Sequence, residues 1–363
     1  MVTDRRSAQA LLRSVLLAGP GLLLSGCGVS YVAQAARGQF DLMQAREPVA
    51  RVLARPDTPA SLRATLEQSR RIRDFASAEL GLPDNASYRS YADLHRPYAV
   101  WNVVAAPALS LTPRSWCFPV AGCVAYRGYF SERAAEAFAA RLRARGDDVI
   151  VGGVPAYSTL GHFADPLTST MTRYGELEVA ALVFHELAHQ VAYLPGDSAY
   201  NEAFATVVEE EGVARYAAAR GVAPALAEWR RRRAQRVEIA RLFLARRAQL
   251  LRVYAGPGDE AGRRRDKAQV MEALAGDLRA LERRSGQATG YGPWIDAGLN
   301  NAHLVSIATY YDQMPRFERM LAAQGADLER FYASVREEVA LRRPKPPRPQ
   351  VGPHPVAVRL PRP

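Results

Sequence analysis

The spacing of apolar residues predicts a chain built mainly of helices. Residues 28–80 are expected to be helical, with segments at 40–53 and 59–79 divided near Pro56. Further helices are expected at residues 131–146, 179–193, 198–220, 224–254, 260–284, 294–311 and 315–341. Segments rich in valine, tryptophan and tyrosine predict strands at residues 98–106, 124–130 and 148–154. The pattern therefore predicts a predominantly helical α+β fold with a small sheet that has an exposed edge.

Two of these helices are long and charged, and they are joined by Gly256-Pro257-Gly258. In the first of them Val237, Leu244 and Leu251 repeat every seven residues, which is the spacing of a coiled-coil seam. We expect the two helices to pack together as a hairpin at about residues 224–285. The hairpin would be an insertion in a single larger domain.

A His-Glu-x-x-His motif lies inside the apolar helix expected at residues 179–193. On a helix, His185 and His189 lie on one face, so that their imidazole nitrogens can reach one zinc ion at about 2.1 Å. Glu186 stands beside the first of them, where a carboxylate can take a proton from a water held by the metal. Only three positions are fixed, and roughly one chain in a hundred of this length would match by chance. A surface pair of histidines is therefore the alternative.

A catalytic zinc ion needs a third protein ligand. Glu202 follows His189 by thirteen residues, and the intervening Leu194-Pro195-Gly196-Asp197 predicts a turn before a second helix capped by Ser198. An antiparallel pair of helices would bring Glu202 over the two histidines. Glu209, seven residues further along the same face, is either the alternative ligand or a residue that orients a zinc-bound histidine.

The oxyanion that develops during hydrolysis needs a further donor on a distant segment. His303 is the histidine that remains once the two ligands and those in loops and tail are set aside. Tyr310 follows it by seven residues, so one helix face can present both. The alternative is that Tyr310 and its neighbour Tyr311 are core or interface aromatics. The catalytic candidates are thus Glu186, Tyr310 and His303.

The N-terminus predicts export. A basic region is followed by a short apolar stretch that ends in Leu24-Ser25-Gly26-Cys27, which resembles the lipobox of bacterial lipoproteins. An ordinary signal peptide explains the small residues before Cys27 less well. We expect a signal peptide at residues 1–26, a lipid on Cys27 and a mature domain at 27–342, followed by a disordered, proline-rich tail at 343–363. Gly28, rather than Asp, favours the outer membrane facing the periplasm.

Cys117 and Cys123 are the other cysteines, and they flank a short segment with proline and glycine. An exported compartment permits disulfides, so this pair is expected to form one. A second zinc site has no nearby histidine or further cysteine pair to support it, and two free buried thiols are the remaining reading.

The chain is basic, with a formal net charge of +11 at pH 7. No nucleic-acid motif accompanies the excess, and an exported protein rarely meets nucleic acid, so no such partner is expected. Arg230-Arg231-Arg232-Arg233 is expected to form a solvated helix face, or one that meets anionic lipid head groups. The sequence does not indicate an oligomeric state.

The motifs together carry a family resemblance. His185–His189 followed by Asn201-Glu202 resembles the gluzincin class of zinc peptidases, which implies a zincin-like core with His185, His189 and Glu202 as ligands and Glu186 as the base. The motifs that carry a closer resemblance are the lipobox, residues 116–119, 122–123 and 153–161, and Asn300-Asn301. They are similar to a family of proteobacterial lipoproteins described as putative aminopeptidases, over most of residues 25–340.

Three functions follow as hypotheses. The first is an envelope-anchored zinc aminopeptidase, which needs an acidic group for the substrate's free amine; Asp165 and Glu209 are candidates. The second is a zinc endopeptidase, with the peptide held as an added strand along residues 149–157. The third is a non-catalytic lipoprotein with a structural metal, against which Glu186 argues because a structural site needs no base.

Overall fold

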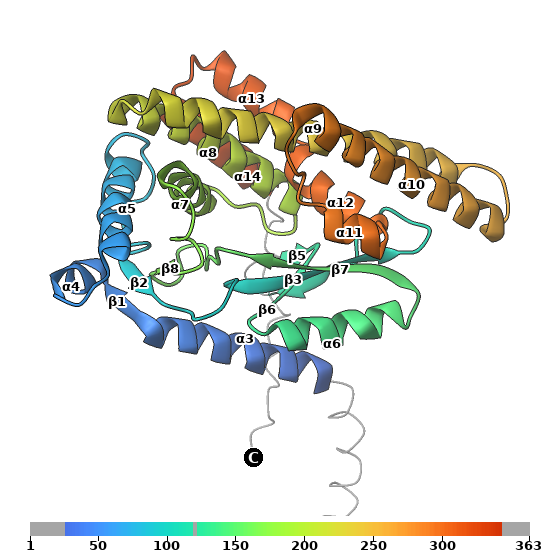
Figure 1. Ribbon diagram of the computed structural model, residues 1–363, viewed down its shortest axis with the longest axis horizontal. Coiled ribbons are helices and arrows are strands. Elements are labelled where there is room, and N and C mark those ends of the chain that lie inside the picture. The colour runs from blue at the N-terminus through green and yellow to red at the C-terminus, as the bar shows by residue number, and fades with distance from the viewer. Residues whose placement is uncertain (1–25, 119–121, 343–363) are drawn as a thin grey trace, which may run out of the picture.

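The computed structural model describes residues 26–118 and 122–342 (Figure 1). The predicted proline-rich tail and residues 1–25 of the predicted signal peptide lie outside the described residues. Within the described ranges, none of the helices combines the length and the apolar character that a membrane span requires.

Most of the described chain is helical, as predicted. The helices are α3 (Gly26–Ala45), α4 (Val49–Ala54), α5 (Ala60–Ala78), α6 (Glu132–Arg143), α7 (Glu176–Val191), α8 (Ser198–Arg220), α9 (Ala223–Ala255), α10 (Glu260–Ser285), α11 (Gly292–Ala297), α12 (Asn301–Tyr311), α13 (Met314–Ala323) and α14 (Leu328–Arg342). The strands are β1 (Arg46–Pro48), β2 (Ser90–Ala92), β3 (Val100–Pro107), β4 (Trp116–Phe118), β5 (Gly122–Val124), β6 (Arg127–Tyr129), β7 (Asp147–Val154) and β8 (Leu167–Thr168).

The strands form three small sheets. One has the order β6-β3-β7 and is antiparallel throughout, the second has the order β1-β2-β8, and the third is the β4-β5 hairpin. The fold is therefore a predominantly helical α+β fold, as predicted. In the first sheet β7 pairs only with β3 among the described strands, so it is an edge strand.

Helices cover both faces of the β6-β3-β7 sheet (Figure 1). Alternate residues of a strand point to opposite faces, and both sets are mainly apolar here. Val103 and Val149 pack with α6 on one face, while Val104 and Ile150 join a core with α9, α10 and α12 on the other. This burial on both faces fixes the register of β3 against β7.

The α7–α8 pair forms the centre of the larger core. Phe184 of α7 and Phe204 of α8 are fully buried. Phe204 stacks near Phe331 of α14, and Phe184 lies beside Phe75 of α5. The two helices are thus fixed from both sides by aromatic packing.

The predicted hairpin is present as α9 and α10, but its buried stripe differs from the one expected. Ile239, Phe243 and Leu250 are buried against α10, whereas Leu251 is 45% exposed. The hairpin packs against α12 as well as within itself. The buried stripe is therefore displaced by one residue, with Phe243 and Leu250 buried in place of the predicted Leu244 and Leu251.

The predicted division near Pro56 is present between α4 and α5. Three segments predicted as continuous helices are divided elsewhere. The segment 40–53 is interrupted by β1, which ends at Pro48. Gly298, with a φ of 95°, separates α11 from α12, and Gly325, with a φ of 65°, lies between α13 and α14. A positive φ is inexpensive only for glycine, and these two glycines mark breaks that apolar spacing alone did not reveal.

The predicted disulfide joins Cys117 of β4 to Cys123 of β5. The hairpin contacts two other parts of the chain. Phe118 stacks on Tyr31 of α3 at 5.6 Å between ring centroids. Gly122 lies so close to the turn at Pro195 that an added Cβ would come within 2.9 Å of its carbonyl carbon. The disulfide hairpin therefore connects α3 to the turn between α7 and α8.

Candidate metal centre

Helix α7 presents His185, Glu186 and His189 toward a common cavity. The two imidazole rings lie 4.9 Å apart between centroids and are nearly perpendicular. The opposite side of α7 carries Phe184 and Leu187, which are fully buried. Burial of that side fixes the rotation of the helix, and this rotation directs the histidines outward from the core.

The turn after α7 returns the chain as α8. The side chain of Asn201 clamps it: Oδ1 accepts a hydrogen bond from the Leu194 amide, and Nδ2 donates one to the Leu194 carbonyl. Asp197, rather than the expected Ser198, is the N-cap, because its carboxylate accepts from the amide of Tyr200. Asn201 thus holds the neighbouring Glu202 in place, a role that the sequence had not revealed.

Glu202 meets both histidines. Its Oε2 lies 3.1 Å from Nε2 of His185 and 3.8 Å from Nε2 of His189. One donor atom from each of the three side chains lies within 4.8 Å of the others. Ligands placed tetrahedrally about 2.1 Å from one zinc ion would be about 3.4 Å apart. The three residues therefore fit the donor set and the spacing of a divalent metal site.

Glu209 lies on the other side of the His185 ring, with Oε2 3.1 Å from Nδ1. A carboxylate in that place fixes the tautomer and the orientation of a ligating histidine. The geometry thus brings together His185, His189 and Glu202 as the possible ligands and gives Glu209 the orienting position. From the sequence alone, either Glu202 or Glu209 could have been the third ligand.

Arg233 supports this side of the site. It forms an ion pair with Glu210 and donates to the hydroxyl of Tyr311, with Nη1 to oxygen 3.0 Å. Its side chain is 11% exposed, and the described neighbours Arg231 and Arg232 pair with glutamates. The expectation of a solvated arginine face is therefore wrong for Arg233, and Tyr311 belongs to this partly buried network.

The pKa values of His189, Glu202 and His185 show a site that favours a bound positive charge. Burial lowers the pKa of His189 to about 4, so this imidazole is neutral. Burial would raise the pKa of Glu202, but the hydrogen bond from His185 outweighs it and lowers the pKa. Burial would lower the pKa of His185, yet its hydrogen bonds to Glu202 and Glu209 raise it well above its ordinary value. The pocket is therefore arranged to hold a positive charge between carboxylates.

Glu186 lies next to this cluster without belonging to it. Its pKa is raised to about 7, first by burial, while the charge of His185 opposes the shift. A general base is most effective when its pKa lies near the working pH. Glu186 therefore has the position and the acidity of a base at neutral pH.

The ligands open into a cleft with a volume of about 480 Å³. Its walls are largely aromatic and apolar, and come from α3, the disulfide hairpin, the β6-β3-β7 sheet, the segment after β7, the turn after α7 and helix α12. The aromatic residues among them are Tyr31, Phe118, Tyr126, Phe130, Tyr157, Tyr193 and Tyr310. Among the residues that line it in the described chain, Glu186 and Glu202 are the acidic ones.

Three tyrosines of the cleft lie in the field of Glu202. The charge of Glu202, followed by burial, raises the pKa of Tyr310 well above 10. Burial followed by the same charge raises the pKa of Tyr126, and raises that of Tyr193 to about 12. All three hydroxyls therefore keep their protons at neutral pH and can donate hydrogen bonds. Tyr126 and Tyr193 carry no motif and were missed in the sequence.

His303 does not join the site. It is 4% exposed, and its Nδ1 accepts a hydrogen bond from the backbone amide of Asn300, completing a capping box at the start of α12. Its ring stacks near Trp294 at 5.1 Å. The expected catalytic role of His303 finds no support in this geometry, because the residue is occupied in beginning the helix.

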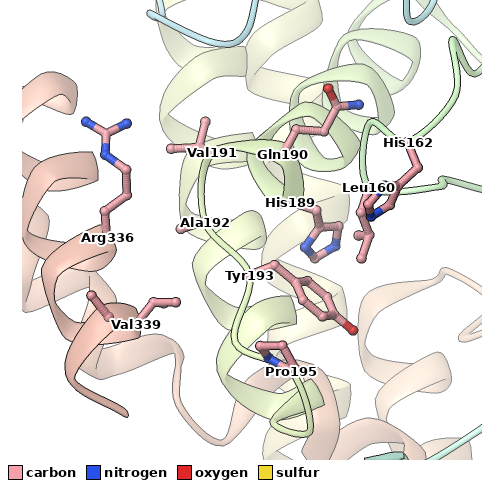
Figure 2. Close-up of a pocket in the computed structure, with 11 residues that line it drawn as sticks. Leu160, His162, His189, Gln190, Val191, Ala192, Tyr193, Pro195, Arg336 and Val339 are labelled. Carbon is pink, nitrogen blue, oxygen red and sulfur yellow. The ribbon is translucent and has the colours of Figure 1, made fainter. Parts of the chain in front are cut away.

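A second cavity, of about 410 Å³, lies on the other side of His189 and Tyr193 (Figure 2). The loop with Leu160 and His162 borders it, and Arg336 of α14 lies across from that loop (Figure 2). Leu160, His189 and Tyr193 line the main cleft too. The second cavity therefore adjoins the cleft at these residues.

Asp165, one candidate for binding a substrate amine, is fully buried. Its carboxylate accepts hydrogen bonds from the amide and the hydroxyl of Thr159, at 2.8 and 2.9 Å. Glu209, the other candidate, bonds to His185. Neither carboxylate is therefore presented to a substrate.

The chain belongs to the family described as "Putative aminopeptidase", whose sequence model matches residues 30–347. This membership indicates a peptidase. No curated protein and no solved structure showed a significant match.

Proposed function

We propose that this protein is a zinc-dependent peptidase of the gluzincin type. The observation that carries the proposal is the convergence of His185, His189 and Glu202 on one point, with Glu186 beside them. Two histidines and one carboxylate form a common ligand set of catalytic zinc.

Zinc bound there would acidify a water molecule and polarise the carbonyl of the scissile bond. Glu186 accepts the proton of the attacking water and delivers it to the departing amine. Glu209 keeps the His185 ring oriented. The hydroxyl of Tyr310, protonated at neutral pH, donates to the developing oxyanion, with Tyr126 as the nearby alternative donor.

The family description names an aminopeptidase, and this is the first candidate for the reaction. A second candidate, an endopeptidase, is favoured by the cleft itself. It adjoins a further cavity beyond His189, and its acidic lining residues are Glu186 and Glu202, both of which have other roles. Using the residues that the structure describes, an exopeptidase would have to hold the substrate's ammonium group without a dedicated carboxylate.

We also propose that a lipid on Cys27 holds the protein at the cell envelope, facing the periplasm at the outer membrane. The lipobox-like sequence before Cys27 supports this, and the disulfide Cys117–Cys123 agrees with an oxidising compartment. Two or more acyl chains would give a stable anchor.

Glu186→Gln tests the peptidase proposal. The amide keeps the size of the side chain but cannot accept the proton, so hydrolysis of a mixed peptide library should fall by at least about 100-fold. Zinc content, measured by mass spectrometry of the purified protein, should stay at the wild-type level. Unchanged hydrolysis in the zinc-loaded variant would contradict the proposal.

Peptides with free and acetylated N-termini separate the two candidate reactions. An aminopeptidase cleaves the free peptide and spares the acetylated one. Cleavage of both inside the chain, read by mass spectrometry of the products, would establish the endopeptidase.

A further inference from the structure

On the face of the β6-β3-β7 sheet that meets the cleft, one row of paired residues contains two glycines. Asn102 of β3 pairs with Gly128 of β6 on one side and with Gly152 of β7 on the other. Paired residues of an antiparallel sheet point to the same face. The side chain of Asn102 therefore stands between two positions without side chains.

The space over Gly152 is open. A Cβ atom added to Gly152 would meet nothing within 4 Å, whereas one on the next residue, Gly153, would collide with the ring of Tyr98 on the opposite face. Glycine weakens a strand interior, and it often marks a place where a ligand comes close to the backbone.

This space belongs to a pocket of about 210 Å³ between the sheet and helices α11 and α12. Asn102, Tyr126, Val154 and Tyr310 line both the pocket and the main cleft, so the two adjoin each other. The other side chains of the pocket are uncharged: Val104, Ala125, Ile150, Trp294, Ser306 and Thr309. The pocket thus begins at Tyr310, which also borders the metal ligands.

We propose that this pocket is the subsite for the side chain of a substrate residue that flanks the scissile bond, and that it selects apolar side chains of the size of leucine or phenylalanine. The proposal rests on the proposed peptidase function. The walls formed by Val104, Ile150 and Trp294 favour apolar groups. A charged side chain would lose its water there without finding a partner.

Asn102 stands at the junction of the pocket and the cleft, where the substrate main chain must pass. A carboxamide can both donate and accept a hydrogen bond, which matches the C=O and N–H groups of a peptide. A substrate whose side chain enters the pocket would therefore place its backbone beside Asn102.

Gly152→Ala and Gly152→Val test the proposal, because each adds a side chain to the floor of the pocket. Both residues are compatible with a β-strand. Gly276→Ala, in the exposed part of α10, is the matched control. Two peptide sets, varied on either side of the scissile bond with Ala, Leu, Phe, Lys or Glu, are assayed for kcat/KM. The same peptides are titrated calorimetrically into the zinc-loaded proteins in the Glu186→Gln background, which measures binding without turnover.

We expect Gly152→Val to lower kcat/KM and affinity by about tenfold or more for Leu and Phe at one of the two positions, with Ala peptides changed by less than about twofold. The losses for Gly152→Ala should lie between those of the wild type and Gly152→Val. Gly276→Ala should have the kcat/KM values and affinities of the wild type. A uniform loss for all side chains, or none, would overturn the subsite. If the wild-type protein cleaves no peptide, the peptidase proposal fails, and the binding titrations alone then decide on the pocket by the same size dependence.

Discussion

The carboxylate of Glu209 lies 3.1 Å from Nδ1 of His185, on the side of the ring away from Glu202. One imidazole therefore meets two carboxylates, and each of its nitrogens has a separate partner. Such a carboxylate behind a ligating histidine raises its basicity and fixes its orientation. Loss of Glu202 and loss of Glu209 should therefore have different effects on zinc binding.

Glu202→Ala should abolish stoichiometric zinc binding, because it removes a ligand. Glu209→Ala should keep the site but weaken zinc affinity by about 10–100-fold. Competition with a fluorescent chelator measures both, and Glu211→Ala, which removes a carboxylate of α8 paired with Arg215, is the control. If Glu209→Ala loses zinc completely while Glu202→Ala retains it, the two roles are reversed.

Tyr310→Phe should lower kcat by about 100-fold or more, with little change in KM, because a donor to the oxyanion acts mainly in the transition state. Tyr311→Phe is the matched control, since the hydroxyl of Tyr311 accepts from Arg233 rather than lining the cleft. Steady-state kinetics on one good substrate measure both variants. Equal losses in the two would show that packing, not hydrogen bonding, explains the effect.

The ligands could be predicted from the sequence because they lie on two consecutive helices. His185 and His189 are fixed by helical spacing, and Glu202 needs only a turn to return to them. Tyr126 and Tyr193 could not be found in this way. They come to the cleft through loop geometry and sheet register, which depend on distant packing.

The predictions of structure failed where the outcome depends on tertiary contacts or on the exact start of a helix. The α9–α10 hairpin follows from length, charge and the connecting glycines, but its buried stripe depends on α12, a contact that no local pattern reveals. His303 carries an imidazole, a common catalytic group, yet its place at the third position of α12 gives it a capping role.

Removing the disulfide should destabilise the protein moderately. Cys117 and Cys123 are six residues apart, and closing so short a loop is worth about 2 kcal/mol in the chain-entropy model. The Cys117→Ser/Cys123→Ser double variant should lose that amount in urea unfolding, and dithiothreitol should lower the wild type toward it while leaving the variant unchanged. Equal stability of the oxidised wild type and the variant would show that packing against Tyr31 and the Pro195 turn holds the hairpin alone.

His303 should make the fold sensitive to mild acid. Burial lowers its pKa from 6.5 to about 4, so the folded protein binds fewer protons than the unfolded chain between these values. Its contribution is fully present above pH 6.5 and is lost as the pH falls toward 4, by on the order of 3 kcal/mol. Protonation also takes from Nδ1 the lone pair that accepts from Asn300.

His303→Gln keeps an acceptor at the third helical position, as a capping box requires, but does not titrate. Urea unfolding of both proteins at several pH values between 4 and 6.5 should show a steeper acid loss for the wild type, and parallel curves would contradict this origin of the sensitivity.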